Sequence, residues 1–494
     1  MTTNYFTLLF ILITLGFQAQ TFVPDDAFEQ RLIDLGYDTP PLDDFVPTAN
    51  INTVTTLFIN NLPISDLTGI EDFAALEILI VKNTNLTSLD VSSNSALIRL
   101  DCQYNQLTSV NVSGLVNLEE FILFGNSIAT IDVSSNSALT KFNGGDNPYT
   151  SLDFSNNPNL EFIGSPNGSL SSLLVTGLTT LEEVYVQQNQ LNTLDLSGNP
   201  GLQFLDAFDN ALTLLDVTGN SALQIANVQN NMLSTLDVST NSQLISLNCG
   251  QNNITSLSVT NHPNLLTLRC QNNQLTALDI SGATSLNELN CSDNLLTALD
   301  VTNTPNLNRV TTSNNQLANV DFTINTGLQY LTMDHNLLTG IDLTSNTNLF
   351  QVVLNDNLLS SMDIKNGNNT AIGIFNTLNN PSLGCIQVDD AAYSTANWTQ
   401  IDATTQFYED CSLGIDNLSF YESVVWPNPT SSLLRLAKKD AVAYTVYSTN
   451  GKQVLQGPTF PSEGLDISGL KNGVYFLKLI SAEGFLQIEK IIKK

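Results

Sequence analysis

Positively charged residues are scarce in this 494-residue chain, which has 16 Lys and Arg against 47 Asp and Glu and a net charge of −31. Nine of the sixteen lie within 435–494, so the rest of the chain, 1–434, carries seven basic and 42 acidic side chains. Such a surface repels phosphate backbones and anionic lipid headgroups. We therefore predict that nucleic acid is not a partner of this protein.

Side chains for acid–base and nucleophilic catalysis are also few. His262 and His335 are the only histidines, and neither a Ser or Cys nucleophile motif nor a Gly-rich phosphate loop accompanies them. A carboxylate pair for glycoside hydrolysis needs an irregular pocket, which the gapless repeat described below does not provide. We predict that the protein is not an enzyme and uses no cofactor.

Long apolar runs are missing beyond the start of the chain. The run from Phe6 to Phe17 is too short to span a bilayer and ends in small and polar residues near Ala19, although no Lys or Arg precedes it. Residues 1–19 are therefore predicted to be a secretory signal peptide. No later segment is apolar enough to be transmembrane, so we expect an exported protein in which disulfides are permitted.

A repeat of constant length dominates the rest of the chain. One signal resembling Leu-Asp-Val-Ser returns at every twenty-first position, beginning at Leu89, Val110, Ile131, Leu152, Leu173, Leu194, Leu215, Leu236, Leu257, Leu278, Leu299, Val320, Ile341 and Met362. A second signal, L-x-x-L-x-[LC]-x-x-N, interleaves with it, as in Leu97, Leu100, Cys102 and Asn105. Each unit thus consists of two similar half-coils, the first one position longer than the second.

The alternation within each half-coil has the period of a strand and is too short for a helix. Stacked coils place each strand about 4.8 Å from its copy, which predicts two parallel sheets around one narrow core in a curved rod. Residues 54–378 resemble leucine-rich repeat proteins of the short bacterial type with nested half-repeats, sometimes called IRREKO. The fold class is therefore mainly β, a leucine-rich repeat solenoid followed by a small antiparallel β-sandwich tail.

An asparagine column marks the end of the second signal in most coils, from Asn105 to Asn357, with Gly168 in place of one member. A carboxamide both donates and accepts, so each Asn is expected to satisfy backbone groups in its own and the next coil. At Gly168 we expect a local distortion.

Both ends of an open solenoid need a cap. Residues 20–53 are predicted to form a helical N-terminal cap, with an amphipathic helix over 24–36. Cys385 and Cys411 lie outside the repeat register and are predicted to form a disulfide in a C-terminal cap over 379–415. The other cysteines, Cys102, Cys249, Cys270 and Cys291, occupy a leucine position, which favours core packing over a metal site.

The C-terminal segment, 416–494, follows a different pattern. Alternating segments such as residues 443–447 and 473–479 are separated by turn signals, which indicates antiparallel strands. Pro427-Asn428-Pro429-Thr430, residues 473–476 and the Lys-rich end together resemble the sorting domain of the type IX secretion system of Bacteroidetes, with Trp426 in place of the usual Tyr. The resemblance implies export by that machinery to the medium or the cell surface.

An aspartate column occupies the outward position of the second strand in eleven of fourteen units: Asp90, Asp132, Asp153, Asp195, Asp216, Asp237, Asp279, Asp300, Asp321, Asp342 and Asp363. Stacked carboxylates repel one another unless they are hydrogen-bonded or bound to metal. The sequence favours hydrogen bonds from neighbouring Ser, Thr and Asn side chains and leaves calcium open.

Aromatic residues gather at outward positions near the first strand of the early coils, whereas later coils carry mainly Asn, Gln, Ser and Thr there. We predict that six of them bind a ligand, on the expectation that the first sheet is concave: Tyr104, Phe124, Phe162, Tyr185, Phe204 and Phe208. The predicted ligand is a protein in preference to a glycan. The alternatives are burial of these rings by their neighbours, and an adhesive or structural spacer without a discrete ligand.

Overall fold

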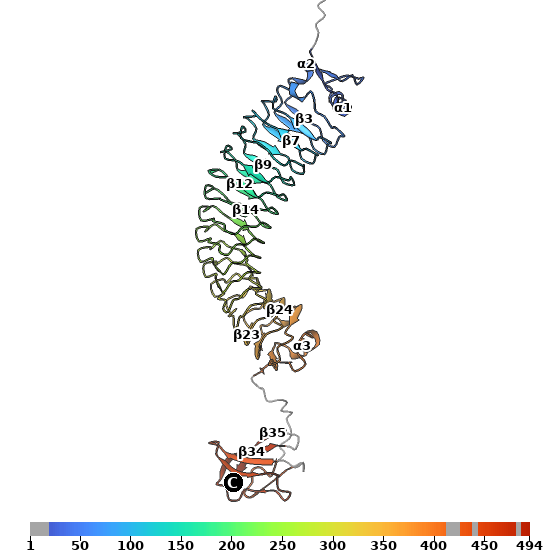
Figure 1. Ribbon diagram of the computed structural model, residues 1–494. Coiled ribbons are helices and arrows are strands. Elements are labelled where there is room, and N and C mark those ends of the chain that lie inside the picture. The colour runs from blue at the N-terminus through green and yellow to red at the C-terminus, as the bar shows by residue number, and fades with distance from the viewer. Residues whose placement is uncertain (1–18, 412–424, 437–442, 481–485) are drawn as a thin grey trace, which may run out of the picture. The chain divides into compact units, whose positions relative to one another are not determined.

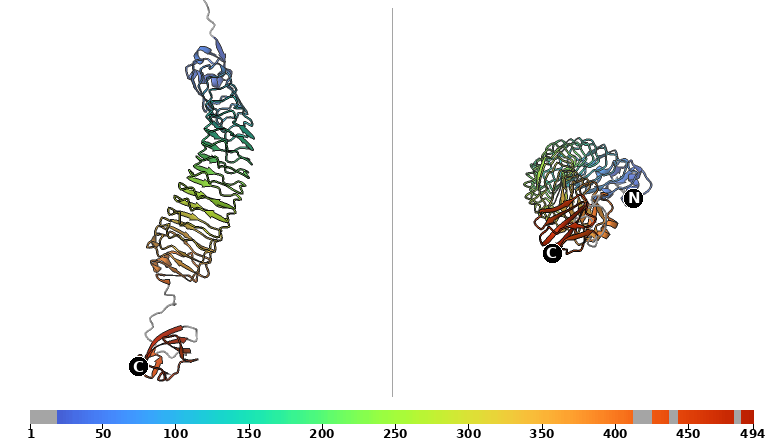
Figure 2. Two further views of the ribbon diagram at one scale, coloured as in Figure 1. Left: turned by 90° about the vertical axis from the view of Figure 1, so that its left-hand side faces the viewer. Right: turned by 90° about the horizontal axis from the view of Figure 1, so that it is seen from below.

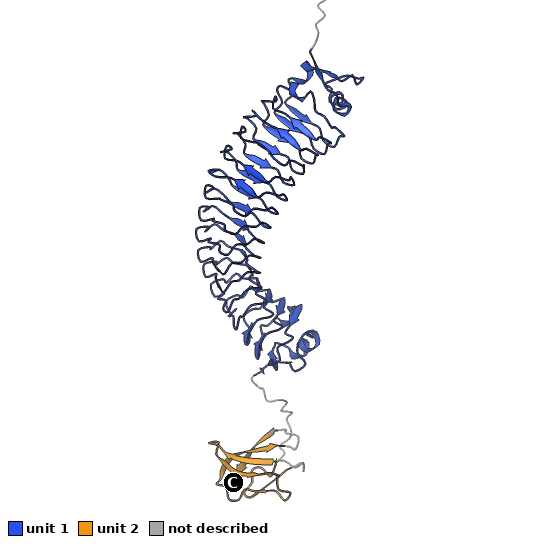
Figure 3. Ribbon diagram, viewed as in Figure 1, with its two compact units in different colours: residues 1–411 blue, residues 412–494 orange. Residues whose placement is uncertain are grey.

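The computed structural model describes residues 19–411, 425–436, 443–480 and 486–494 (Figure 1). They belong to two compact units, residues 1–411 and 412–494 (Figure 3). The predicted signal peptide falls almost wholly outside the described residues, and so does the predicted boundary near residue 415. Within the described segments, every helix is too short or too polar to cross a membrane.

The first unit is a bent solenoid of stacked coils (Figures 1 and 2). Its first sheet is continuous, parallel and in register. The sixteen strands, in chain order, are β3 (Thr56–Phe58), β4 (Ile78–Ile80), β6 (Arg99–Asp101), β8 (Glu120–Ile122), β9 (Lys141–Asn143), β11 (Phe162–Gly164), β13 (Glu183–Tyr185), β14 (Phe204–Asp206), β15 (Ile225–Asn227), β16 (Ser246–Asn248), β18 (Thr267–Arg269), β20 (Glu288–Asn290), β21 (Arg309–Thr311), β22 (Tyr330–Thr332), β24 (Gln351–Val353) and β26 (Ile374–Asn376).

The second sheet is parallel but interrupted, because several coils are extended there without pairing. Its strands are β5 (Ser88–Asp90), β7 (Ser109–Asn111), β10 (Ser151–Asp153), β12 (Ser172–Leu174), β17 (Ser256–Ser258), β19 (Ala277–Asp279), β23 (Gly340–Asp342), β25 (Ser361–Asp363), β27 (Cys385–Gln387) and β28 (Gln406–Tyr408). The prediction of two parallel sheets is confirmed.

The core lies between the two sheets and is filled by the inward residue of each strand. Leu100 of β6 and Leu89 of β5 are both buried in one continuous cluster that runs from Val23 to Phe407. Because the side-chain period of a strand is two, the residues on either side of each inward residue point away from the core.

The asparagine ladder connects each coil to the preceding one, which corrects the predicted direction. Asn126 Nδ2 donates to the carbonyl of Leu123 in its own coil at 2.9 Å and to that of Cys102 in the coil before at 3.1 Å. Its Oδ1 accepts the N–H of Leu107, also in the preceding coil. Each inward carbonyl thus has two amide donors.

The coil at Gly168 is not distorted, contrary to prediction. Strand β11 pairs in register with β9 on one side and β13 on the other. Removing one ladder amide is tolerated because the Gly144 carbonyl keeps the bond from Asn147 and the Ser165 carbonyl keeps the bond from Asn189.

A second, fully buried ladder was not predicted. Asn220 Nδ2, for example, donates to the carbonyls of Leu196 and Asn199 at 3.0 and 2.7 Å. The repeated Asn was visible in the sequence, as Asn94 of the first unit shows. In one coil His262 takes its place and its Nε2 lies 2.9 Å from the Val238 carbonyl.

The N-terminal cap combines two helices with a small sheet. Helix α1 (Asp26–Asp34) lies within the segment predicted as a helix, and β1 (Gln20–Phe22) pairs antiparallel with β2 (Phe45–Pro47), which precedes α2 (Thr48–Ile51). Asp25 accepts the N–H groups of Ala27 and Phe28 and, through its other oxygen, that of Ser65. The helix start is thereby fixed to the first coils.

The C-terminal cap continues the solenoid. Strands β27 and β28 stack on β25, and α3 (Ala391–Asn397) lies between them in the chain. Short 3₁₀ turns, η1 (Ile70–Asp72) and η2 (Asn369–Ala371), occur near the two ends. Cys385 and Cys411 form the predicted disulfide, with Cα atoms 6.0 Å apart.

The tail unit contains two antiparallel sheets around a core of its own, as predicted. One sheet holds β29 (Val425–Trp426), β30 (Leu433–Leu436) and β33 (Leu465–Asp466), and the other holds β32 (Gln453–Gly457), β31 (Ala443–Ser448), β34 (Gly473–Ile480) and β35 (Leu486–Lys493). Val446, Leu477 and Ile491 are fully buried between them.

Candidate ligand-binding face

The first-sheet face consists of the outward residues of the first-sheet strands and the turn residues that follow them. In each strand the middle residue points inward, while the first and third residues point outward. The turn then reaches a left-handed residue, such as Tyr104 or Asp209, before the ladder Asn. The six predicted aromatic residues all lie on this face.

Tyr104 and Phe124 form one aromatic pair beyond the ends of β6 and β8. Their ring centroids are 5.6 Å apart with an edge-to-face geometry. The Tyr104 ring covers Gly125, where a Cβ would lie 2.8 Å from the ring, and Phe124 covers Gly145 in the same way. Tyr104 is 51% exposed and Phe124 is half-buried. The glycines thus let these rings lie against the backbone of the next coil.

Phe162 and Tyr185 form a second pair on β11 and β13. Their centroids are 5.5 Å apart, and Lys141 Nζ lies 5.0 Å from the centre of the Phe162 ring. Partial burial, followed by a hydrogen bond with Glu183, raises the pKa of the Tyr185 hydroxyl. Both rings are half-buried and are therefore held in fixed orientations.

Phe204 and Phe208 lie in one coil, at the start of β14 and after its end. Both are half-buried, and Phe204 is in register with Glu183 and Ile225 of the neighbouring strands. The six aromatic residues therefore do not form one contiguous strip on the strands. Four of them form two ring pairs, and the other two, Phe204 and Phe208, lie in one coil. Half of the six residues, Tyr104, Phe124 and Phe208, lie in turns.

The alternative of burial is partly correct, because Tyr104 is the one of the six whose side chain is mainly exposed. Each of the other five rings loses part of its surface to its own or a neighbouring coil.

A second cluster near the C-terminal end of the same face was missed. The Arg309 guanidinium lies 3.9 Å from the centre of the Tyr330 ring, and Tyr330 contacts Phe350 edge-to-face at 5.9 Å. Phe350 and Ile374 are each 46% exposed. The prediction that later coils are mainly polar is therefore wrong for the last three. Arg309 and Tyr330, both first residues of their strands, were recognisable from the constant repeat spacing.

Amide side chains occupy the face between the two aromatic regions. Asn248 Nδ2 donates to Gln229 Oε1 and Gln229 Nε2 donates to Gln251 Oε1, both at 2.7 Å. Asn227 Nδ2 donates to Asp206 at 3.0 Å. These bonds run from coil to coil and order the polar part of the face.

Most of the basic residues of the solenoid also lie on this face, each against a side chain of another coil. Lys82 Nζ is 2.7 Å from the buried Asp101 carboxylate, and Arg269 binds Glu288 through two nitrogens. Arg99 lies 3.3 Å from Glu120. The face therefore presents neutralised charges beside its aromatic rings.

The aspartate column of the second sheet is hydrogen-bonded throughout. In all eleven units one carboxylate oxygen accepts the backbone N–H of the residue two positions later. In Asp216 the Thr218 hydroxyl donates as well, at 2.6 Å. The hydrogen-bonded alternative is thus confirmed.

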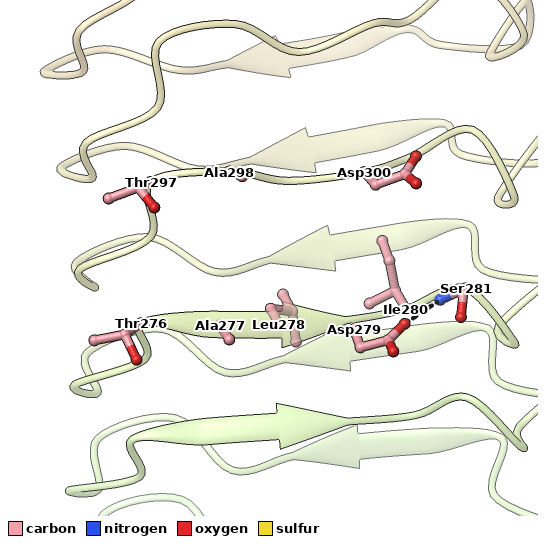
Figure 4. Close-up of a pocket in the computed structure, with 9 residues that line it drawn as sticks. All are labelled: Thr276, Ala277, Leu278, Asp279, Ile280, Ser281, Thr297, Ala298 and Asp300. Carbon is pink, nitrogen blue, oxygen red and sulfur yellow. Dashed lines mark hydrogen bonds between the residues drawn. The ribbon is translucent and has the colours of Figure 1, made fainter.

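A shallow hollow on this sheet separates β19 from the unpaired segment 297–300 of the next coil (Figure 4). Asp279 and Asp300 line it, and each carboxylate is already bonded to its own turn. Among the described residues, no three His, Cys, Asp or Glu side chains are grouped to hold a metal ion.

These turn bonds predict a loss of stability in acid. The Ser or Thr hydroxyl and the backbone N–H two positions on lower the pKa of Asp90, Asp132, Asp195, Asp216 and Asp300 below 3.8, and for Asp237 and Asp321 the N–H is the larger cause. A lowered folded-state pKa stabilises above the unfolded value and is lost as pH falls through the folded one. We expect the melting temperature to fall below about pH 4.

The comparison is a variant with Ser197→Ala, Thr218→Ala and Thr302→Ala, which removes three donating hydroxyls. Its melting temperature should fall less steeply over the same acid range. An unchanged slope would show that the turns do not cause the acid sensitivity.

The four cysteines at the leucine position are fully buried and unpaired. Burial raises the pKa of the Cys249 and Cys291 thiols to about 12 and that of Cys270 well above its ordinary value. Three of them stack in adjacent coils. They pack as small apolar side chains.

We expect these four thiols to be unreactive in the folded protein, because the thiolate is the reactive form and burial suppresses it. Titration with an aromatic disulfide reagent should detect none in the native protein, four after denaturation and six after denaturation with prior reduction. Rapid reaction of a native thiol would contradict the buried arrangement.

Comparison with known proteins agrees with the two-part structure. Residues 424–494 match the family model of the secretion system C-terminal sorting domain. No curated protein matches the chain. The tail places the protein among those exported to the medium or the cell surface by the type IX system.

Solved structures similar to this one are leucine-rich repeat solenoids. The functional domain of InlJ from Listeria monocytogenes, which includes a cysteine ladder, is 22% identical with a TM-score of 0.52, over 97% of this chain and 100% of that one. A leucine-rich repeat protein of Leptospira interrogans is 21% identical with a TM-score of 0.53, over 66% and 85%. The Arabidopsis receptor kinase HAESA, in complex with the peptide hormone IDA and a co-receptor, is 19% identical with a TM-score of 0.53, over 76% and 73%. These similarities establish the fold class.

Proposed function

We propose that the solenoid binds a protein ligand on the first-sheet face and that the tail delivers it to the cell surface or the medium. The observation that carries the proposal is the set of ordered aromatic residues on that face, which includes the pairs Tyr104–Phe124 and Phe162–Tyr185. The Tyr104 and Phe124 rings pack on the backbone at Gly125 and Gly145, and the Phe162 ring packs against Lys141. Rings that are already ordered in this way lose little conformational entropy when a partner contacts them. Aromatic anchors of this kind dominate protein interfaces.

The bend of the solenoid also supports the first-sheet face as the binding surface. Coils in a bent stack are closest together on the inner side, and only the first sheet keeps strand pairing without interruption over sixteen strands. We therefore assign the first sheet to the concave side, where a ligand contacts several coils at once. The Arg309–Tyr330–Phe350 cluster adds a second contact region beyond the amide-rich coils.

A catalytic role has little support in the described structure. His262 is buried and its Nε2 contacts a backbone carbonyl, while His335 is exposed in a turn between Asp334 and Asp356. Neither histidine lies near a nucleophile arranged as in a catalytic triad. We therefore propose that the protein acts by binding. The spacer alternative predicts that the first-sheet face has no discrete ligand.

Binding is tested by capture from the culture medium and envelope of the source organism, followed by calorimetry with the identified protein. Phe124→Ala, Tyr185→Ala and Phe208→Ala should each weaken affinity by more than about 1 kcal/mol, the scale of hot-spot residues. Because these rings are half-buried, each change should also cost about 1 kcal/mol of stability.

Alanine at Asn248, Asn290 and Thr311, in the polar part of the same sheet, provides the control. Equal losses of affinity in both sets would remove the aromatic residues as the binding determinant. Capture of no partner would favour the spacer, and affinity unchanged in every variant would place the binding site elsewhere.

A further inference from the structure

The first sheet ends with an unpaired backbone carbonyl just before β26. In each of the fifteen preceding coils, the carbonyl before the strand accepts two backbone N–H groups from the next coil. The Phe350 carbonyl, for example, accepts those of Gly373 at 2.9 Å and Ile374 at 3.2 Å. The Gly373 carbonyl holds the equivalent position and receives no backbone bond from any described residue.

Helix α3 explains why the position is open. The bridge between Asn376 and Gln400 sets the register of the last coil, so Trp398 lies opposite Ile374. In the earlier coils, the residue equivalent to Trp398 donates its N–H to the carbonyl just before the strand of the preceding coil, which here is the Gly373 carbonyl. Here the Trp398 N–H donates to the Ser394 carbonyl at 2.8 Å and terminates α3 instead. The helix end therefore takes the donor that would have closed the sheet.

A groove lies where the missing pairing would have been. Residues 372–375 line one side, and Tyr393 with residues 397–400 line the other. Trp398 stacks on Phe375 at 4.2 Å and covers the end of the core, and its indole N–H has no partner in the described structure. Ile374 is 46% exposed. Because the indole nitrogen is buried, the groove itself offers one open backbone acceptor and an exposed apolar wall.

At the N-terminal end of the same sheet, a side chain of the cap binds one carbonyl of the edge strand. Arg31 of α1 donates through Nε and Nη2 to the Phe58 carbonyl of β3, at 3.2 and 3.1 Å. Among the described residues, no side chain donates to the Gly373 carbonyl in this way.

We propose that this groove binds a short, extended, apolar peptide segment of a partner protein. An extended backbone carries N–H groups along one edge, so it can donate to the Gly373 carbonyl while its side chains contact Ile374. The strands rejoin at Asn376 and Gln400, which limits the added segment to two or three paired residues. The strongly acidic solenoid favours a neutral or basic segment.

The test selects displayed random ten-residue peptides against the full-length protein and measures the affinity of the best peptide. Ile374→Arg fills the groove, and Ile225→Arg is its matched control, because both residues begin a first-sheet strand and are partly exposed. Affinity should fall more than about tenfold for Ile374→Arg and remain unchanged for Ile225→Arg. Methylation of the peptide N–H that donates to the Gly373 carbonyl should have a similar effect, whereas methylation of the neighbouring N–H groups should not.

Failure to enrich any peptide overturns the proposal, as does equal binding to both arginine variants or insensitivity to backbone methylation. A concentration-dependent dimer that Ile374→Arg abolishes would replace the peptide with a second copy of the chain and would also overturn it. Phe124→Ala should leave peptide binding intact, which separates this proposal from the first-sheet face.

Discussion

Deletion of residues 416–494 should leave a folded solenoid that no longer reaches the cell surface. The tail has its own buried core, which shares no residue with that of the solenoid. Its removal therefore takes no side chain from the larger core, and the melting temperature of the solenoid should not change. Surface delivery should fall more than about tenfold when whole cells are labelled with an antibody.

A substitution in the full-length chain tests whether surface delivery requires the tail to be folded. Leu477→Asp places a charge in the tail core, whereas Gln456→Asp adds the same charge at an exposed position. The first should reproduce the deletion and the second should be delivered normally. Normal delivery of the deleted form would show that the tail is not the export signal.

Asn252→Ala should cause a large loss of stability in the solenoid. Asn252 Nδ2 donates to the carbonyls of Val228, Cys249 and Gly250, and its Oδ1 accepts the Leu233 N–H. Alanine leaves buried groups in two coils without partners, and each such group costs about 1–3 kcal/mol. We expect the free energy of unfolding to fall by about 2–4 kcal/mol.

The neighbouring Asn253 supplies the matched control. It is exposed, and its side chain takes part in one long hydrogen bond, at 3.4 Å, from Gln274. Asn253→Ala should change stability by no more than about 0.5 kcal/mol in chemical denaturation. Similar effects of the two substitutions would show that the ladder amides are not what holds adjacent coils together.

The constant repeat spacing alone determined the stacked coils, the parallel register and the inward residues. A strand has a period of two, so the alternation of Leu89, Val91 and their copies leaves one choice of buried face. The disulfide followed from Cys385 and Cys411 lying outside the register, and the sorting domain from its motifs. The hydrogen bonds of the Asp column were predictable because the donors are two positions away in the chain.

Contacts between residues of different coils were decided only by the tertiary structure. The sequence shows that Tyr104 and Phe124 are outward residues, but the absence of a Cβ at Gly125 and Gly145 in the next coils is what lets their rings lie flat. Likewise, nothing local to Gly373 reveals its open carbonyl, because the missing donor, the Trp398 N–H, is taken by α3 much later in the chain. Repeats fix contacts between equivalent positions, whereas contacts between unlike positions depend on how the coils are stacked and where the stack ends.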